Sequence, residues 1–249
     1  MPGFIGYIGK NKDFKFDNNK EPKLVYSSYE TDTYHLERRT INKFLDDKVF
    51  DDSDDLLIVT EGVVLNKNQL IEKYKQSSFK ECIAYMYNTL GDTFFNEFRG
   101  SFSGLLYDKK KDKYLIYTDH IGDKQVFYSQ FKEDLLFATD MRFIIETLKK
   151  NNKTLSLNKT GAYLVLTHGF VIEDHTLVEE VKKLSAGHYL KYDSNGLHEI
   201  QYHRFSNQPR KEMTADEAVE EIDRLFRQAV RRQFDKDLEY GYKHITCLS

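Results

Sequence analysis

Short strand-like segments at close and regular spacing run through the middle of this chain, and they constrain its fold most. Residues 102–107, 114–118, 125–130 and 135–138 are short, rich in apolar and aromatic side chains, and closely spaced. The polar run 108–112 supplies a hairpin turn between the first two of them. Strands joined by such turns pair antiparallel, in one sheet or a pair of sheets, and helices group outside them. The sequence therefore predicts an α+β fold.

The flanking segments fit the same fold. Residues 4–9 are apolar but interrupted by glycines, as in a central strand that another backbone approaches closely. Another predicted strand bends around Glu61 and Gly62. The acidic run 46–55 is predicted to be a solvated loop, and the lysines of 109–111 a solvated hairpin tip. The remaining predicted elements are strands over 24–29, 33–39, 187–193 and 196–202 and helices over 67–75, 79–89, 141–149 and 158–166.

Composition excludes several classes of function. A net charge of −3 and a pI near 6.3 argue against nucleic acid or an anionic membrane as partner. The apolar runs are far shorter than the roughly 18 residues of a membrane-spanning helix. No basic region followed by a long apolar stretch marks a secretory signal. Cys82 and Cys247 are too few for a disulfide framework, so we expect a protein of the reducing cytoplasm.

The composition changes after Phe205. Residues 206–210 have the character of a linker. Thr214 and Glu217 have the spacing of a capping box, which opens a helix with an apolar face. Residues 242–248 then alternate as a strand. A helix and a strand cannot bury a core alone, so we expect the opening of a second domain, cut away after Ser249.

Before any family resemblance is considered, the sequence shows no recognisable catalytic motif. The chain has no G-x-S-x-G elbow and no G-x-x-x-x-G-K-S/T phosphate loop. Its eight histidines follow no metal-ligand spacing, and His120 suits a turn as readily as a ligand. Cys82 lies among apolar neighbours of a predicted helix, where a packed thiol is expected instead of a nucleophile.

Four stretches in a fixed order resemble motifs of asparagine synthetases. Residues 98–108 are similar to the family's G-x-F-A-F-A-I-Y-D hairpin, and 119–128 to its D-x-x-G-x-K-P-L-Y-Y. Residues 136–141 resemble its L-x-F-A-S-E, and 176–190 its T-L-F-x-G-I-x-K-L-P-P-G-H-Y-L. Each stretch alone is weak evidence of a resemblance. The four stretches occur in the family's order, however, and together with the two ends of the chain they cover nearly the whole sequence.

The resemblance implies an architecture. It predicts a class II glutamine amidotransferase domain of the N-terminal-nucleophile (Ntn) hydrolase type over 1–205, a four-layer αββα sandwich of two antiparallel sheets. Residues 206–213 would be a linker, and 214–249 the first helix and strand of an ATP-pyrophosphatase synthetase domain. Leu248 and Ser249 would form the edge of its truncated nucleotide loop. A complete synthetase domain implies ATP and Mg²⁺, while this chain is expected to hold no cofactor and no metal.

The glutaminase residues carry over poorly. Members of the family begin Met-Cys-Gly, and that cysteine attacks glutamine, whereas this chain has Pro2, which leaves no catalytic nucleophile. The family's N-G-E strand aligns with Glu61, Gly62 and Val63, so a carboxylate replaces the Asn that donates to the oxyanion, and Val63 replaces the Glu that holds the substrate ammonium. Two further glutamine-binding residues of the family are an arginine and an acid. The arginine aligns with Arg38 or Arg39, whereas the acid is expected near Ser78 or Phe79, where none occurs.

Three hypotheses follow from these replacements. In the first, the chain is the amidotransferase-type domain of an ATP-dependent amide-forming ligase that has lost glutamine hydrolysis, as in β-lactam synthetases and lasso-peptide cyclases. In the second, it is an active glutaminase with an altered site that uses the Pro2 amine. In the third, it is a non-catalytic binding module. The expected partners are its own synthetase domain and a small-molecule or peptide substrate, with no nucleic acid and no membrane, and a homodimer stays open.

Overall fold

The computed structural model describes residues 3–11, 14–16, 21–42, 48–206 and 212–239. The chain separates into two compact units, Met1–Arg204 and Phe205–Ser249. The first unit holds every described strand, and the second holds one long described helix. The assignment of the second unit to a synthetase domain stays a prediction.

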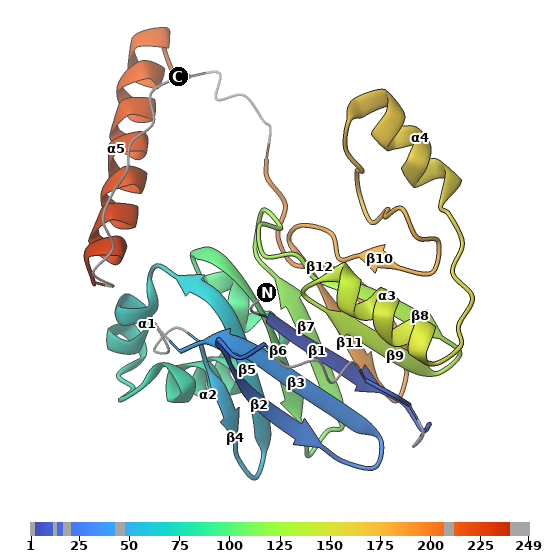
Figure 1. Ribbon diagram of the computed structural model, residues 1–249. Helices are drawn as coiled ribbons and strands as arrows, with labels where there is room; N and C mark the ends of the chain where they lie inside the picture. Colours follow the sequence, from blue (N-terminus) through green and yellow to red (C-terminus); the bar gives the residue numbers. More distant parts are fainter. Residues whose placement is uncertain (1–2, 12–13, 17–20, 43–47, 207–211, 240–249) are drawn as a thin grey trace. The chain divides into compact units, whose positions relative to one another are not determined.

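Two sheets, each of six strands among the described residues, form the first unit (Figure 1). In spatial order the first sheet contains β10 (Lys182–Lys183), β8 (Phe127–Phe131), β9 (Asp134–Ala138), β1 (Gly3–Ile8), β3 (Tyr34–Ile41) and β2 (Leu24–Glu30). The second contains β12 (Gly196–Gln201), β11 (His188–Asp193), β7 (Lys113–Thr118), β6 (Gly100–Asp108), β5 (Leu56–Val64) and β4 (Phe50–Asp52). Their described pairings are antiparallel, as predicted.

Alternating side chains of the strands build three apolar layers. Leu57 of β5 and Phe4 of β1 pack together between the two sheets. Ile58, one residue after Leu57, points to the opposite face of its sheet and packs under the helices that follow β5. Ile5 likewise points outward from the first sheet and packs with Ile144. This order of helices, sheet, sheet and helices confirms the predicted four-layer αββα sandwich.

The helices begin where the sequence offers polar caps. Ser78, Asp140 and Asn158 each accept a hydrogen bond from a backbone N–H in the first turn of the helix that follows. Among the described residues no helix combines the length and apolar character needed to cross a membrane. The helices of the first unit are α1 (Lys67–Tyr74), α2 (Phe79–Leu90), the 3-10 helix η2 (Gly91–Glu97), α3 (Met141–Lys150) and α4 (Lys159–His168).

The prediction of a loop throughout the acidic run 46–55 was wrong. Within it β4 forms an edge strand, antiparallel to β5. Acidic side chains suit an edge strand because one side faces solvent and charges there oppose further pairing. The run also meets the β6–β7 turn, since Asp52 Oδ1 lies 2.5 Å from Lys109 Nζ and Asp55 Oδ2 lies 2.6 Å from Lys110 Nζ. The acidic run and the lysine run thus partly neutralise each other.

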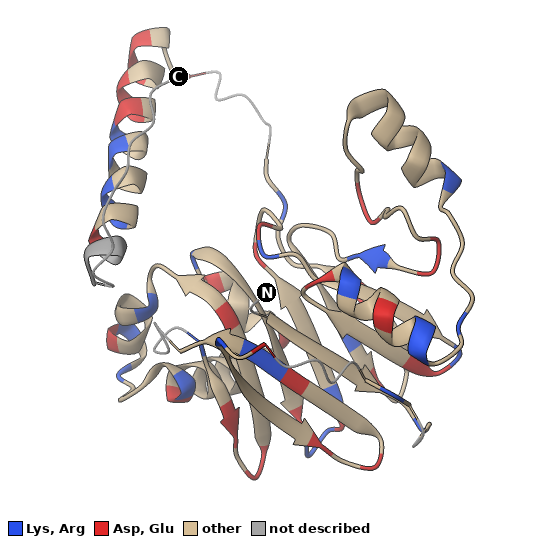
Figure 2. Ribbon diagram, viewed as in Figure 1, with Lys and Arg blue, Asp and Glu red and all other residues tan. Residues whose placement is uncertain are grey.

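Helix α5 (Ala215–Glu239) makes up most of the described part of the second unit. The predicted capping box is confirmed: the Thr214 N–H donates to Glu217 Oε2 at 2.8 Å, and the Glu217 N–H donates to Thr214 Oγ1 at 3.3 Å. Figure 2 shows acidic residues at the start of α5, where negative charge suits the helix dipole. The predicted strand 242–248 lies outside the described residues, as do Leu248 and Ser249.

Packing of the helical layer on the second sheet can be tested at Phe95. This side chain is fully buried and stacks on Tyr117 with ring centroids 4.4 Å apart. We expect Phe95→Ala to lower the free energy of unfolding by about 3–5 kcal/mol because it leaves a cavity. Tyr85→Ala, on the exposed side of α2, is the control and should cost less than about 1 kcal/mol. Urea unfolding followed by circular dichroism measures both, and equal losses would contradict the layered packing.

Candidate functional site

Strand register brings four polar side chains into the layer between the sheets. Arg38 lies opposite Phe4 in the β1–β3 pairing, and Phe4 belongs to the inter-sheet core, so Arg38 points the same way. Thr40 follows two residues later on the same face of β3. Glu61 points inward from β5, and Ser103 lies opposite it in β6. The four residues gather at the end of the sandwich where β1 begins.

A buried ion pair joins the two sheets at this place. Arg38 Nε lies 3.8 Å from Glu61 Oε1, and the two residues are 7% and 5% exposed. The terminal nitrogens of Arg38 are already engaged, since Nη1 donates to the Lys48 carbonyl at 2.9 Å and Nη2 to Ser27 Oγ at 3.2 Å. Arg38 is therefore fixed in place with its Nε side facing Glu61.

Four polar atoms of the site have unused hydrogen-bonding capacity. Arg38 Nε, Glu61 Oε1, Thr40 Oγ1 and Ser103 Oγ are buried and lack a well-formed hydrogen bond, although the Thr40 hydroxyl lies close enough to the Glu61 carboxyl to favour its charged form. Buried side-chain polar atoms in proteins mostly have partners, and leaving one unpaired costs about 1–3 kcal/mol. Such a group of atoms, with both donors and acceptors, is typical of a place that takes up a polar ligand.

Burial dominates the electrostatics of Glu61. Removal from water raises the pKa of the Glu61 carboxyl to about 7, although Arg38, Lys48, Lys124 and the nearby Thr40 hydroxyl all favour its charged form. Burial likewise lowers the pKa of Arg38, against the attraction of Glu61. Near neutral pH the Glu61 carboxyl therefore exchanges between a neutral form that can donate a hydrogen bond and a charged form that repels anions.

The other predicted pocket residues take different positions. Arg39 points to the outer face of the first sheet, where its Nε donates to Glu37 Oε1 at 2.6 Å and its guanidinium lies 4.3 Å from the ring centroid of Phe143. Gly62 has φ +103°, and a Cβ there would lie 2.1 Å from the Ser101 carbonyl oxygen, so only glycine fits. Val63 follows on the inner face of β5 and brings no charge to the site.

The segment 119–124, which carries the D-x-x-G-x-K resemblance, is held by one buried carboxylate. Asp119 accepts hydrogen bonds from the backbone N–H groups of Ile121, Asp123 and Lys124. The Thr118 hydroxyl donates to the Lys124 carbonyl at 2.5 Å. This rigid turn places Lys124 close enough to Glu61 to favour its ionised form.

Sequence reasoning missed Thr40, Ser103 and Lys124 as members of the site. Thr40 and Ser103 are detectable only from register, because a lone hydroxyl in a strand is usually a surface residue. Near the position of the expected acid, Ser78 caps α2 and Phe79 is buried in the outer helical layer. Pro2 lies outside the described residues, directly before Gly3 of β1.

Cys82 and His120, which the sequence analysis considered as a nucleophile and a ligand, do not belong to this candidate site. Cys82 is fully buried in α2 with its Sγ 3.7 Å from the Met86 sulfur, and burial raises the pKa of its thiol to about 11. This confirms a packed thiol. His120 Nε2 lies 3.2 Å from Asn96 Oδ1, and its ring meets that of His203 edge-on with centroids 4.4 Å apart. Burial lowers the pKa of His120, with a smaller contribution from His203.

Comparison with known families agrees with this architecture. A model of the glutamine amidotransferase domain matches residues 47–203, more than half of the chain. The chain belongs to this family. The predicted resemblance to asparagine-synthetase-like class II amidotransferase domains is thereby confirmed.

Individual relatives of this amidotransferase domain are distant. A Methanocaldococcus jannaschii protein, provisionally named asparagine synthetase (glutamine-hydrolyzing) 2, is 26% identical over 196 residues, covering 76% of this chain and 38% of its own length. Asparagine synthetase (glutamine-hydrolyzing) 2 of Bacillus subtilis is 23% identical over 205 residues, covering 75% of this chain and 27% of its own length. The chain thus spans well under half of the curated relatives it matches. The glutamine phosphoribosylpyrophosphate amidotransferase of B. subtilis superposes with a TM-score of 0.47 at 10% identity, covering 82% of this chain and 44% of that chain.

The raised pKa of Glu61 predicts a pH-dependent stability. Its folded value of about 7 lies above the ordinary 4.5, so the folded state holds a proton that the unfolded chain releases between these values. Stability contributed by Glu61 is therefore present at low pH and lost as pH rises, by about 2–3 kcal/mol between pH 5 and pH 8. Urea unfolding at several pH values should show that Glu61→Gln lacks this loss.

The exposed Glu220 provides the matched control for that measurement. Glu220→Gln removes the same carboxyl chemistry from the surface of α5 and should keep the wild-type pH slope. The interpretation fails if Glu61→Gln and the wild type lose equal stability between pH 5 and pH 8.

Proposed function

We propose that this chain is the amidotransferase-type domain of an asparagine-synthetase-like, ATP-dependent amide-forming ligase, and that it does not hydrolyse glutamine. The observation that carries the proposal is the buried Arg38–Glu61 pair, because its Glu61 aligns with the strand position where the family resemblance requires an asparagine donor. Pro2 at the nucleophile position and Val63 at the ammonium-binding position support it.

Glutamine hydrolysis of this type needs three chemical groups that Pro2, Glu61 and Val63 supply poorly. The reaction needs a nucleophile, and proline has no nucleophilic side chain. It needs a donor to the developing oxyanion, but at and above neutral pH a large share of Glu61 is a carboxylate and repels that charge. It needs an anion for the substrate ammonium, and Val63 is apolar. The single missing donor alone would cost about 10²–10³ in rate.

The retained features support a scaffold or binding role beside a synthetase domain. The sandwich keeps its apolar layers, and the site keeps polar atoms with unused capacity. The partners that we propose are a synthetase domain of the same protein and a small-molecule or peptide substrate. ATP and Mg²⁺ would belong to that domain, and since Leu248 and Ser249 lie outside the described residues, no step is derived through them. The two cysteines still favour a reducing cytoplasm as its compartment.

A glutaminase assay on the purified chain tests the proposal. With mass spectrometry confirming whether Met1 has been removed, we expect ammonia release from glutamine at the no-enzyme background. Pro2→Cys alone should stay near background because the pocket is unsuited, whereas Pro2→Cys combined with Glu61→Asn and Val63→Glu should be at least about 10²-fold faster than Pro2→Cys.

Two results would count against the proposal. Ammonia release by the wild type that disappears when its N-terminal amine is acetylated would favour an active Pro2-dependent glutaminase. Rapid hydrolysis by Pro2→Cys alone would mean that Glu61 and Val63 do not impair the pocket.

A further inference from the structure

Helix α4 is largely apolar yet almost uncovered. From Thr160 to Ile172 the chain carries no aspartate, glutamate, lysine or arginine. Of the ten residues of α4, all of them described, Gly161 alone is buried. A helix that is apolar all round normally lies in the interior of a protein or an assembly. In Figure 1, α4 stands away from the two sheets on the segments that precede and follow it. The described residues of the first unit thus leave α4 without the cover that its composition calls for.

One side of α4 is anchored to the rest of the unit. Gly161 approaches the Thr176 carbonyl so closely that a Cβ on it would lie 2.2 Å from the carbonyl oxygen. At about 100° per residue, Tyr163 and Leu166 lie on the opposite side of the helix, and they are 67% and 87% exposed. Phe170, just after the helix, is 60% exposed as well. The uncovered side therefore presents three large apolar side chains to water.

The exposed apolar surface along α4 and its flanking segments has the size of a protein interface. A whole aromatic side chain presents about 150–250 Å². At the exposures found in the structure, the large apolar residues of the segment 157–177 together present roughly 700 Å². The largest apolar patch of a monomer is typically about 300–600 Å², whereas each partner of a standard interface buries about 800 Å². The extent therefore suits a protein partner. The contributing residues are Leu157, Tyr163, Leu166, Phe170, Ile172 and Leu177.

Charge marks the two ends of this surface. Lys159 begins α4 and Glu173 lies shortly after its end, and both are exposed. Figure 2 shows a basic residue at the start of α4, acidic residues on the segment that leaves it, and uncharged residues along the helix between them. When two copies of α4 lie antiparallel about a two-fold axis near Leu166, the basic end of each copy comes beside the acidic end of the other. The surface is thus complementary in charge to itself.

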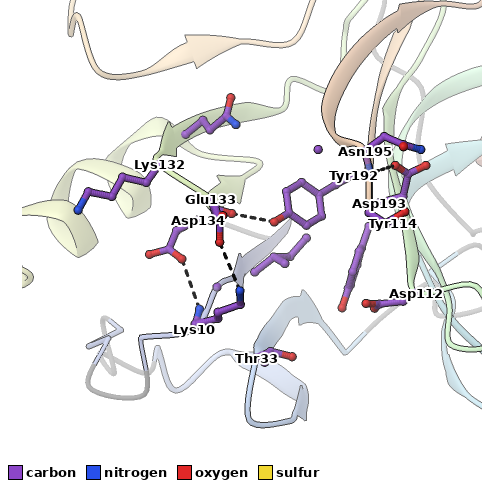
Figure 3. A pocket seen from close by; sticks show the side chains of 15 residues that line it. Lys10, Thr33, Asp112, Tyr114, Lys132, Glu133, Asp134, Tyr192, Asp193 and Asn195 are labelled. Carbon is purple, nitrogen blue, oxygen red and sulfur yellow. Dashed lines mark hydrogen bonds and ion pairs between the residues drawn. The ribbon is translucent and has the colours of Figure 1, made fainter.

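The pocket shown in Figure 3 differs from this surface, because several of its polar groups pair within the chain. Lys10 Nζ lies 3.3 Å from Glu133 Oε2, and the Tyr192 hydroxyl donates to the Glu133 carbonyl at 2.7 Å. Asp193 pairs with Lys191 at 3.4 Å. These polar side chains meet their own requirements, whereas the apolar side chains of α4 stay exposed to water.

We propose that α4 and its flanking segments bind the same surface of a second copy of this chain, so that the protein forms a two-fold symmetric dimer. The apolar side chains opposite Gly161 form the centre of the contact, and the charged ends form its rim. Self-association suits a surface with an uncharged centre, since like charges meeting there would repel. A membrane surface fits less well, because helices that lie on membranes carry lysine or arginine along a polar face. The dimer does not depend on whether the chain hydrolyses glutamine.

Sedimentation equilibrium of the purified chain tests this surface. We expect a monomer–dimer equilibrium whose dimer fraction rises with concentration up to about 100 µM. Leu166→Glu and Tyr163→Glu place like charges near the two-fold axis and should each weaken the dimer at least about tenfold. Lys159→Glu should weaken it as well, and Lys159→Glu combined with Glu173→Lys should restore it to within about threefold of the wild type.

A matched variant on α5 separates this surface from other exposed apolar residues. Phe226 is 68% exposed, so Phe226→Glu adds the same charge to another helix and should leave the dimer unchanged. Circular dichroism confirms that each variant is folded. The proposal is overturned by a wild type that stays monomeric at about 100 µM, or by a dimer that Leu166→Glu leaves intact or that Phe226→Glu weakens equally. Flotation of the wild type with phosphatidylcholine–phosphatidylglycerol vesicles, abolished by Leu166→Glu, would also overturn it by assigning the surface to a membrane.

Discussion

The register between β5 and β6 is the constraint on which the rest of the first unit depends. The pairing runs over nine residue pairs, from Leu56 opposite Asp108 to Val64 opposite Gly100. Because side chains alternate, a slip of one residue would move Leu57 out of the inter-sheet core and turn Glu61 toward the helices. Two glycines hold this register, since a Cβ at Gly62 or Gly100 would collide with a carbonyl oxygen of the opposite strand.

The same register explains why the site can change while the fold persists. Three apolar clusters stabilise the sandwich, and the polar residues at the start of β1 lie at the margin of one of them. A buried ion pair such as Arg38–Glu61 contributes little net stability, because removing both charges from water offsets their attraction. Selection on the core therefore places few limits on which polar residues occupy this margin, and family membership alone does not fix the reaction.

Apolar periodicity and helix caps predicted most of the strands and helices. Which side chains face the interior could not be predicted, because that depends on the register between strands. The sequence pointed to Glu61, Gly62 and Val63 through a motif, but it could not choose between Arg38 and Arg39. Adjacent residues of a strand face opposite sides, and only the pairing with β1 reveals which side is the interior. β4 escaped prediction because acidic residues suit an edge strand as well as a loop.

The packing of Cys82 makes this thiol a natural reporter of motion. Its sulfur is fully enclosed between α2 and the second sheet, and its raised pKa keeps it in the unreactive protonated form at neutral pH. A thiol-modifying reagent reaches it only in molecules whose helical layer has separated from the sheet. The rate at which Cys82 becomes modified under native conditions therefore measures how often that layer opens, without any engineered label.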